Sequence, residues 1–220
     1  MNEFRLLSTK RLPTQQQQRL LATGVTLCSW DFIQTKPLPF NANFENKQLI
    51  FTSQNAVNAV EKELKNAAYE CYCVGEKTKS LLTNKGQKVL KMTKNASVLA
   101  DFLVKQPKNS QFLFLAGTHR RPEIEAAFDK KSLPLTVVEV YTTKPQPKAM
   151  GSYDGILFYS PSGVQSYLQH NSLTNSLCFA IGDTTASELQ QHQPKKIITA
   201  TQPTIDHMIA AVKKKIAPRV

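Results

Sequence analysis

A long internal repeat constrains this chain more than any other feature. A shift of 107 positions (156 − 49) aligns Leu49–Leu82 with Ile156–Leu189 without a gap. The identical residues of the first copy are Phe51, Ser53, Val57, Cys71, Gly75, Thr78, Ser80 and Leu82, which meet Phe158, Ser160, Val164, Cys178, Gly182, Thr185, Ser187 and Leu189. A repeat of this length predicts two similar domains, and 220 residues suffice for two small ones.

Each copy reads as strands that feed helices. In the second copy the apolar runs Ile156–Tyr159 and Cys178–Ile181 both stop at small, polar residues that favour helix starts. The same alternation runs through the whole chain. The expected strands are 4–8, 25–33, 49–52, 71–74, 88–92, 111–116, 135–141, 154–159, 178–181 and 196–200, and the expected helices are 10–23, 55–66, 76–83, 97–105, 121–131, 163–170, 184–191 and 205–216. This order predicts an α/β fold with parallel sheets covered on both faces, whose ligands bind outside the carboxyl ends of the strands.

Two Pro-x-Pro segments bracket one complete run of these units. We expect stiff, extended linkers at 36–39 and 144–148. They would separate an inserted domain, 40–143, from a discontinuous domain made of 1–35 and 149–220. The hinge and both copies of the repeat would then face a cleft between the domains.

Composition narrows the class of protein. Hydrophobic residues make up 41% of the chain and charged residues 20%, as in an ordinary soluble protein. The apolar runs are too short to cross a bilayer, and the N-terminus lacks the apolar core of a signal peptide, so we expect a cytoplasmic protein. The net charge of +12 indicates a polyanionic partner, which could be a nucleic acid, a membrane surface or a multiply acidic small molecule.

Cofactor motifs are missing from the sequence. It has neither G-x-G-x-x-G nor a P-loop, its four histidines lack ligand spacing, and its four cysteines make no C-x-x-C pair. We therefore expect no metal and no cofactor, with the cysteines as buried thiols. Nucleic-acid binding has only the charge in its favour, because basic and aromatic residues do not alternate.

The strand-to-helix joins are the candidate anion sites. Ser160, Ser162 and Gly163 form one join, and Gly182, Thr184 and Thr185 form the other. Their hydroxyls and exposed amides suit a carboxylate or phosphate, although ordinary N-capping explains the same residues. Ser53 and Thr78 hold the equivalent places in the first copy. Arg121 lies in a basic loop after a strand, where it either binds an acid or starts a helix in solvent.

Several short motifs follow one another in a fixed order along the chain. They are F-T-S-Q-N-A-V (51–57), V-G-E-K-T (74–78), N-A-S-V-L-A (95–100), V-Y-T-T (140–143), F-Y-S-P-S-G-V (158–164), A-I-G-D-T-T-A (180–186) and P-T-I-D-H-M (203–208). As an ordered set they resemble the uroporphyrinogen-III synthase family. The resemblance implies two flavodoxin-like α/β domains with parallel sheets, one inserted into the other and joined by a two-segment linker. It also implies a monomer without a cofactor.

The same resemblance implies the substrate and the chemistry. The substrate is hydroxymethylbilane, a linear tetrapyrrole with eight carboxylates, which gives the basic charge a purpose. Its terminal hydroxyl leaves as water, ring D attacks through its substituted carbon, and a spiro intermediate inverts that ring to give uroporphyrinogen III. Tyr141 aligns with a recurrent active-site tyrosine of the family that could assist loss of the hydroxyl.

Ser160 and Thr185 align with cleft positions of the family, Ser53 and Thr78 hold the equivalent places in the inserted domain, and Arg121 matches a basic loop residue loosely, because Pro122 departs from the pattern. Ser162, Gly163, Gly182 and Thr184 join them as substrate-binding candidates from the strand-to-helix joins. Asp183 departs from the proline that is frequent in the family and adds a negative charge there. The alternative hypothesis is a non-catalytic two-domain binder of an organic polyacid, which would bind the bilane without converting it.

Overall fold

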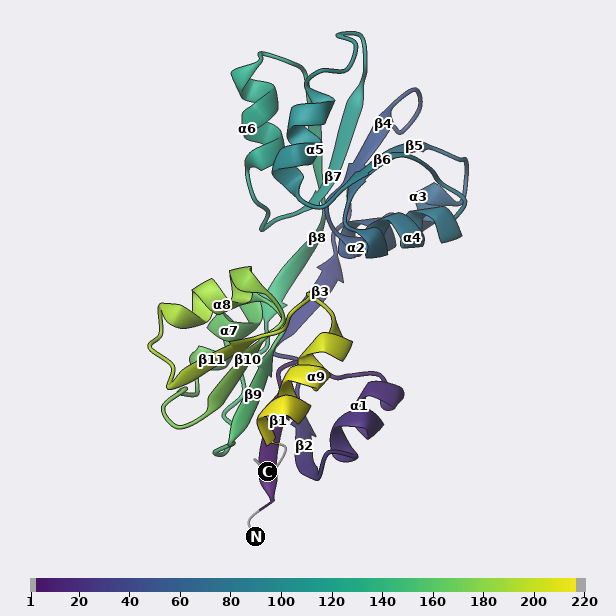
Figure 1. Cartoon of the computed structure of the whole chain (residues 1–220). Coiled ribbons are helices and arrows are strands. Elements are labelled where there is room, and N and C mark those ends of the chain that lie inside the picture. Colours follow the sequence, from purple (N-terminus) through teal and green to yellow (C-terminus); the bar gives the residue numbers. More distant parts are fainter. Residues whose placement is uncertain (1–2, 217–220) are drawn as a thin grey trace. The chain divides into compact units, whose positions relative to one another are not determined.

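The computed structural model describes residues 3–216 and divides the chain into two compact units. Unit 1 comprises 1–34 and 144–220, and unit 2 comprises 35–143. Each unit has a largely parallel sheet with helices on both faces (Figure 1). None of the helices in the described part of the chain is long and apolar enough to span a membrane.

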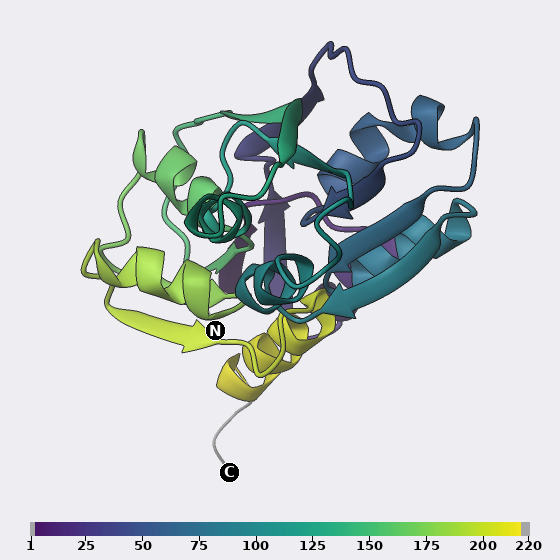
Figure 2. The ribbon, with the colours of Figure 1, turned by 90° about the horizontal axis from the view of Figure 1, so that it is seen from above.

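The unit 1 sheet has five strands in the order β11-β10-β9-β1-β2. They are β1 (Phe4–Ser8), β2 (Val25–Ser29), β9 (Gly155–Phe158), β10 (Leu177–Ala180) and β11 (Lys196–Thr199). Its helices are α1 (Thr14–Leu21), α7 (Pro161–Leu168), α8 (Asp183–Gln190) and α9 (Ile205–Ile216). Figure 2 shows β11 at the sheet edge, with α8 along one side and α9 along the other.

The unit 2 sheet has six strands in the order β3-β8-β7-β4-β5-β6. They are β3 (Ile33–Pro37), β4 (Gln48–Phe51), β5 (Glu70–Val74), β6 (Lys88–Thr93), β7 (Phe112–Gly117) and β8 (Thr136–Pro145). Its helices are α2 (Gln54–Ala59), α3 (Glu61–Leu64), α4 (Glu76–Asn84), α5 (Ala96–Leu103) and α6 (Glu123–Lys130). Strands β3 and β8 each contain residues of both units.

Burial of apolar side chains on both faces of each sheet stabilises the two units. In unit 2, Val57 and Leu82 bring α2 and α4 onto one face, and Leu99 and Phe128 bring α5 and α6 onto the other. In unit 1, α7 and α8 pack on one face, and α1 and α9 on the other. Strands covered twice are apolar throughout, as in β7, where all six residues are buried.

The predicted α/β class with parallel sheets is confirmed, and the repeat explains how the two units correspond. Strands β4, β5 and β6 neighbour one another in the same order as β9, β10 and β11, with β7 and β8 in the places of β1 and β2. The two units therefore share one spatial order that the chain enters at different strands. Read along the chain, unit 1 has the flavodoxin order 2-1-3-4-5, whereas the corresponding strands of unit 2 have the order 3-2-1-4-5.

One expected strand was wrong in its extent, and the expected linkers overlap the ends of two strands. The strand expected at 25–33 is interrupted, because β2 ends at Ser29 and β3 begins at Ile33. Between them Asp31 accepts a hydrogen bond from the Arg11 N–H at 2.8 Å, and the N–H groups of Trp30 and Phe32 donate to the carbonyls of Ser8 and Thr9. The Pro-rich linkers are partly strand, since 36–37 belong to β3 and 144–145 to β8. Both prolines end their strands, where the missing N–H interrupts the least pairing.

Candidate functional site

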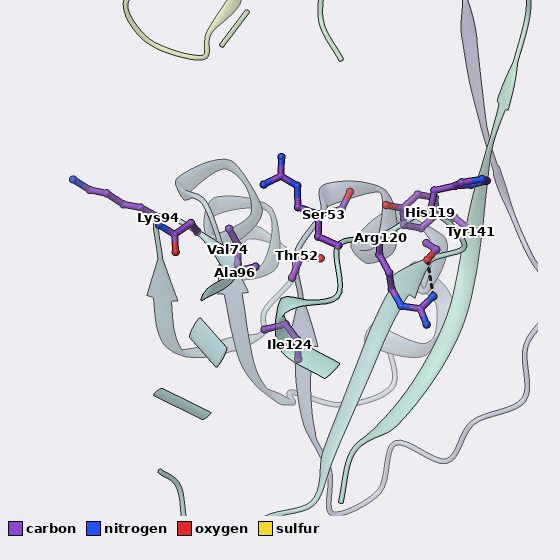
Figure 3. Close-up of a pocket in the computed structure, with 12 residues that line it drawn as sticks. Thr52, Ser53, Val74, Lys94, Ala96, His119, Arg120, Ile124 and Tyr141 are labelled. Atoms are coloured by element: carbon purple, nitrogen blue, oxygen red, sulfur yellow. Dashed lines mark hydrogen bonds between the residues drawn. The ribbon is translucent and has the colours of Figure 1, made fainter. Parts of the chain in front are cut away.

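A cavity of about 370 Å³ lies within unit 2 at the carboxyl ends of its strands. Its lining follows β4, β5, β6 and β7 in turn and reaches β8, as Figure 3 shows for the labelled side chains. The lining residues are Thr52, Ser53, Val74, Lys94, Asn95, Ala96, Gly117, His119, Arg120, Arg121, Ile124 and Tyr141. We call this cavity the carboxyl-edge pocket. Parallel sheets bind ligands at this edge.

Tyr141 reaches the pocket from β8. It is partly buried against the apolar cluster of α2 and α4, and its backbone pairs with Gly117. Its hydroxyl forms no hydrogen bond to another residue within 3–216. The phenol is therefore held by its ring and has a hydroxyl available to a ligand.

The two neighbouring arginines of the pocket differ in their contacts. The Arg120 side chain is only 21% exposed, donates to both oxygens of Glu125, and donates at 2.8 Å to Glu139 and at 3.1 Å to the Gly117 carbonyl. Its hydrogen bonds, chiefly those to Glu125, raise the pKa of Arg120 above its ordinary value. Arg121 is 65% exposed and reaches only Glu123, at 3.9 Å. The Arg120 guanidinium is thus occupied by contacts within the protein, whereas the exposed Arg121 guanidinium is available to an anion.

Polar groups line the opposite rim of the pocket. Ser53 caps α2 by accepting the Asn55 N–H at 3.1 Å, and Asn95 caps α5 by accepting the Val98 N–H at 3.0 Å. Lys94 is exposed beside Asn95. None of the described residues that line the pocket is an aspartate or a glutamate, so its net charge is positive.

The structure brings together three of the predicted residues, namely Ser53, Arg121 and Tyr141. Lys94 and Asn95 were missed as pocket residues, because neither lies in the repeated stretch. Asn95 does stand at the start of one of the quoted family motifs, shortly after the strand predicted at 88–92, and this was the signal that could have found it.

The remaining predicted residues occupy helix starts, mostly in unit 1. The Ser160 hydroxyl caps α7 by accepting the Gly163 N–H at 3.1 Å, and it lies 3.1 Å from the Ser162 hydroxyl. Gly182 precedes α8 without a side-chain cap, and Thr184 is exposed. These residues follow β9 and β10, at the carboxyl edge of the unit 1 sheet.

The two repeated threonines are buried. Thr78 is 4% exposed and Thr185 is 1% exposed. Their N–H groups donate to the carbonyls of Gly75 and Gly182, each at 3.1 Å, so both backbone donors are already paired. This part of the repeat therefore reflects how helices α4 and α8 begin.

Two other cavities of similar size lie in unit 1 and contain none of the predicted site residues. One, of about 410 Å³, lies between β11 and α9 and is lined in part by Lys196, Lys214 and Lys215. The other, of about 360 Å³, is lined in part by Tyr153 and Asn171. The carboxyl-edge pocket is therefore the best candidate among the described cavities.

Solved structures show a similar fold. A uroporphyrinogen-III synthetase from Helicobacter pylori has a TM-score of 0.71 and 19% identity, covering 98% of this chain and 100% of that one. A mutant uroporphyrinogen III synthase from the extremely thermophilic bacterium Thermus thermophilus has a TM-score of 0.65 and 14% identity, with 98% and 100% covered. At these identities the likeness establishes the fold.

Family membership comes from the sequence. No curated protein sequence is similar enough to match. A family model described as uroporphyrinogen-III synthase HemD matches residues 17–210, which is most of the chain. The match favours the enzyme over the non-catalytic polyacid binder and over a nucleic-acid-binding protein. The chain belongs to the uroporphyrinogen-III synthase family, and it is an enzyme of the cyclising-lyase type.

Proposed function

We propose that the carboxyl-edge pocket binds hydroxymethylbilane and that Tyr141 assists the loss of its terminal hydroxyl. Enzymes of this family close this linear tetrapyrrole to uroporphyrinogen III with inversion of ring D. Spontaneous closure gives the uninverted isomer, so the enzyme must favour one geometry of attack. Holding the chain in that geometry is catalysis by orientation.

The observation that carries the proposal is the positive charge around a phenol whose hydroxyl is available to a ligand. Lys94 and Arg121 give positive charge to a pocket without an acidic lining residue, and the Tyr141 hydroxyl is unpaired within the described residues. Eight carboxylates on the substrate match this charge. Backbone and side-chain donors at the strand ends add hydrogen bonds to carboxylate oxygens.

Tyr141 would act as a hydrogen-bond acid. As the bond between the terminal carbon and its hydroxyl breaks, the pyrrole nitrogen supplies the electron pair and the phenol O–H donates to the departing oxygen. Water leaves, and the proton lost from the pyrrole nitrogen restores the phenol. Such assistance contributes about 10²-fold or more to a rate.

The candidates of unit 1 complete the proposal. Ser162, Gly182 and Thr184 present hydroxyls or backbone at one sheet edge, which suits carboxylates, while Ser160 and Gly163 bond to each other and hold the start of α7 beside them. The burial of Thr78 and Thr185 favours a supporting part for them, as the residues that begin α4 and α8. We also propose a monomeric, cytoplasmic enzyme, whose mass in light scattering would equal that of one chain.

Replacing Tyr141 by Phe tests the proposal, with Tyr69→Phe as a matched control. Tyr69 is in the same unit, and its hydroxyl also bonds to no other described residue. We expect Tyr141→Phe to lower kcat by about 10²-fold with no change in thermal stability, and Tyr69→Phe to leave kcat unchanged. Equal loss of activity and stability in Tyr141→Phe would instead make Tyr141 a packing residue.

A further inference from the structure

The position of the Tyr141 ring depends on an irregularity between β7 and β8. The two strands pair residue by residue from Leu113 with Thr136 to Ala116 with Glu139, and the next pair is Gly117 with Tyr141. Val140 is therefore an extra residue in β8, which is a β-bulge. Bulges near active sites redirect the side chains that follow them.

The bulge turns Tyr141 to the other face of the sheet. Successive residues of a regular strand point to opposite faces. Val138 and Val140 pack against the cluster of α2 and α4, and regular alternation would send Tyr141 to the face of α5 and α6. Tyr141 nevertheless packs against the same cluster as Val140. If Val140 paired regularly and there were no bulge, the phenol would point to the face of α5 and α6.

Gly117 provides the space that the redirected ring occupies. A Cβ built on Gly117 would lie 2.6 Å from Cζ, 2.8 Å from Cε2 and 2.9 Å from the hydroxyl oxygen of Tyr141. All three are atoms at the hydroxyl end of the ring. The backbone of Gly117 does not have a positive φ, so alanine fits the backbone, and the three atoms nearest to its Cβ all belong to the phenol.

Polar contacts fix the loop after Gly117 to β8 on both sides of Tyr141. Before it, Arg120 joins the Gly117 carbonyl to Glu139; Figure 3 shows its guanidinium turned back toward the strands. At and after it, the Thr118 N–H donates to the Tyr141 carbonyl at 3.0 Å, and the Thr118 and Thr142 hydroxyls lie 2.9 Å apart. Contacts to Glu139, Tyr141 and Thr142 thus hold β8 on both sides of the bulge.

We propose that Gly117 and Arg120 are positioning residues that hold the Tyr141 hydroxyl in the carboxyl-edge pocket. Gly117 acts by lacking a side chain, and Arg120 acts by tying the Gly117 carbonyl to Glu139. This proposal rests on the proposed function for its kinetic consequence, and its structural consequence is measurable without substrate.

The structural arm uses Gly117→Ala in protein labelled with 3-fluorotyrosine. The chain has six tyrosines, and Tyr141→Phe identifies the ¹⁹F resonance of Tyr141. We expect Gly117→Ala to shift that resonance alone. Gly151→Ala is the matched control, because its Cβ would approach only Arg5 Nη2, at 3.8 Å, and it should shift none. An unmoved Tyr141 resonance in Gly117→Ala would overturn the proposal.

The kinetic arm is a double-mutant cycle. A displaced phenol should lower kcat by about 10²-fold, the cost of misplacing a catalytic group by roughly 1 Å, with KM within about twofold. In the Tyr141→Phe background, Gly117→Ala should have no further effect, because its target is gone. An equal loss of kcat in both backgrounds would refute positioning. If the wild-type enzyme forms no type III product, the proposed function fails, and the fluorine measurement still decides the placement of Tyr141.

Arg120→Lys provides a second variant that keeps the charge. Lysine cannot bond to Glu125, Glu139 and the Gly117 carbonyl in one planar fork. We expect it to shift the Tyr141 resonance and lower kcat with a smaller effect than Gly117→Ala. A normal kcat together with an unmoved resonance would exclude Arg120 from positioning.

Discussion

Replacing the neighbouring residues Arg120 and Arg121 by alanine should have different effects, on stability for Arg120 and on substrate binding for Arg121. Both line the carboxyl-edge pocket, and both carry one positive charge. The Arg120 guanidinium donates hydrogen bonds to Glu125, Glu139 and the Gly117 carbonyl. Among the described residues, Arg121 forms an ion pair only with Glu123, at 3.9 Å. Replacing each by alanine separates binding of the substrate from stability of the unit.

The contacts set the expected magnitudes. A hydrogen bond to a charged group contributes about 1.5–3 kcal/mol. For Arg120 the less exposed Glu125 pair and the Gly117 carbonyl dominate, and since the Glu139 side chain is 47% exposed we give its pair little weight. We therefore expect Arg120→Ala to lower the free energy of unfolding by about 3 kcal/mol. Arg121→Ala should change it by less than about 0.5 kcal/mol, as for other surface substitutions.

Arg121 should matter for substrate binding. Losing one partly exposed contact to a carboxylate, worth about 1.4 kcal/mol, raises KM about tenfold. Because the contact is the same before and during the reaction, kcat should stay within about twofold.

The assay combines urea unfolding with steady-state kinetics on freshly made hydroxymethylbilane. Arg121→Lys is the control that keeps the charge, and its KM should stay closer to that of the wild type. An unchanged KM in Arg121→Ala would refute the assignment of Arg121 to substrate carboxylates. Full stability in Arg120→Ala would refute the division of roles between the two arginines.

Three further predictions concern buried side chains and thiols. Gln87 is 5% exposed, accepts the Tyr69 N–H at 2.9 Å and donates to the carbonyls of Leu64 and Lys85 at 2.9 and 3.0 Å. Gln87→Ala leaves these buried groups unpaired and should lower the free energy of unfolding in urea by about 3 kcal/mol. Replacing the exposed Gln111 by alanine is the control and should hardly change it. A small loss for Gln87→Ala would show that these hydrogen bonds do not stabilise the fold. Burial raises the pKa of the thiols of Cys71 and Cys178 to about 12, so the folded state keeps protons that the unfolded state releases, and stability should fall as pH rises from about 9 toward 12. A thiol reagent at pH 8 should accordingly modify half-buried Cys28 first, and faster labelling of Cys178 would contradict its burial.

The repeat predicted much of the fold because it records local structure. Its two copies begin and end at corresponding places, with β4 and β9 starting at Gln48 and Gly155, and α4 and α8 starting at Glu76 and Asp183. Apolar strands, polar joins and amphipathic helices are all properties of short stretches. They therefore show in the sequence without knowledge of the partner strands.

Features that depend on contacts between distant segments could not be predicted. The break after Ser29 lies where the Asp31 carboxylate meets the Arg11 N–H, a contact that the local sequence does not reveal. The bulge at Val140 lies in an alternating stretch that reads as a regular strand, and only its pairing with β7 reveals the extra residue. For the same reason the sequence could propose Tyr141 but could not indicate that Gly117 makes room for it.

Isomer analysis of the product tests the central claim most directly. The purified protein is given fresh hydroxymethylbilane, the product is oxidised to porphyrin, and the type I and type III isomers are separated and compared with an enzyme-free reaction. We expect type III to exceed its level in the enzyme-free reaction and to increase with enzyme concentration. Only type I product, at the spontaneous rate, would contradict the assignment of this chain as a uroporphyrinogen-III-forming enzyme.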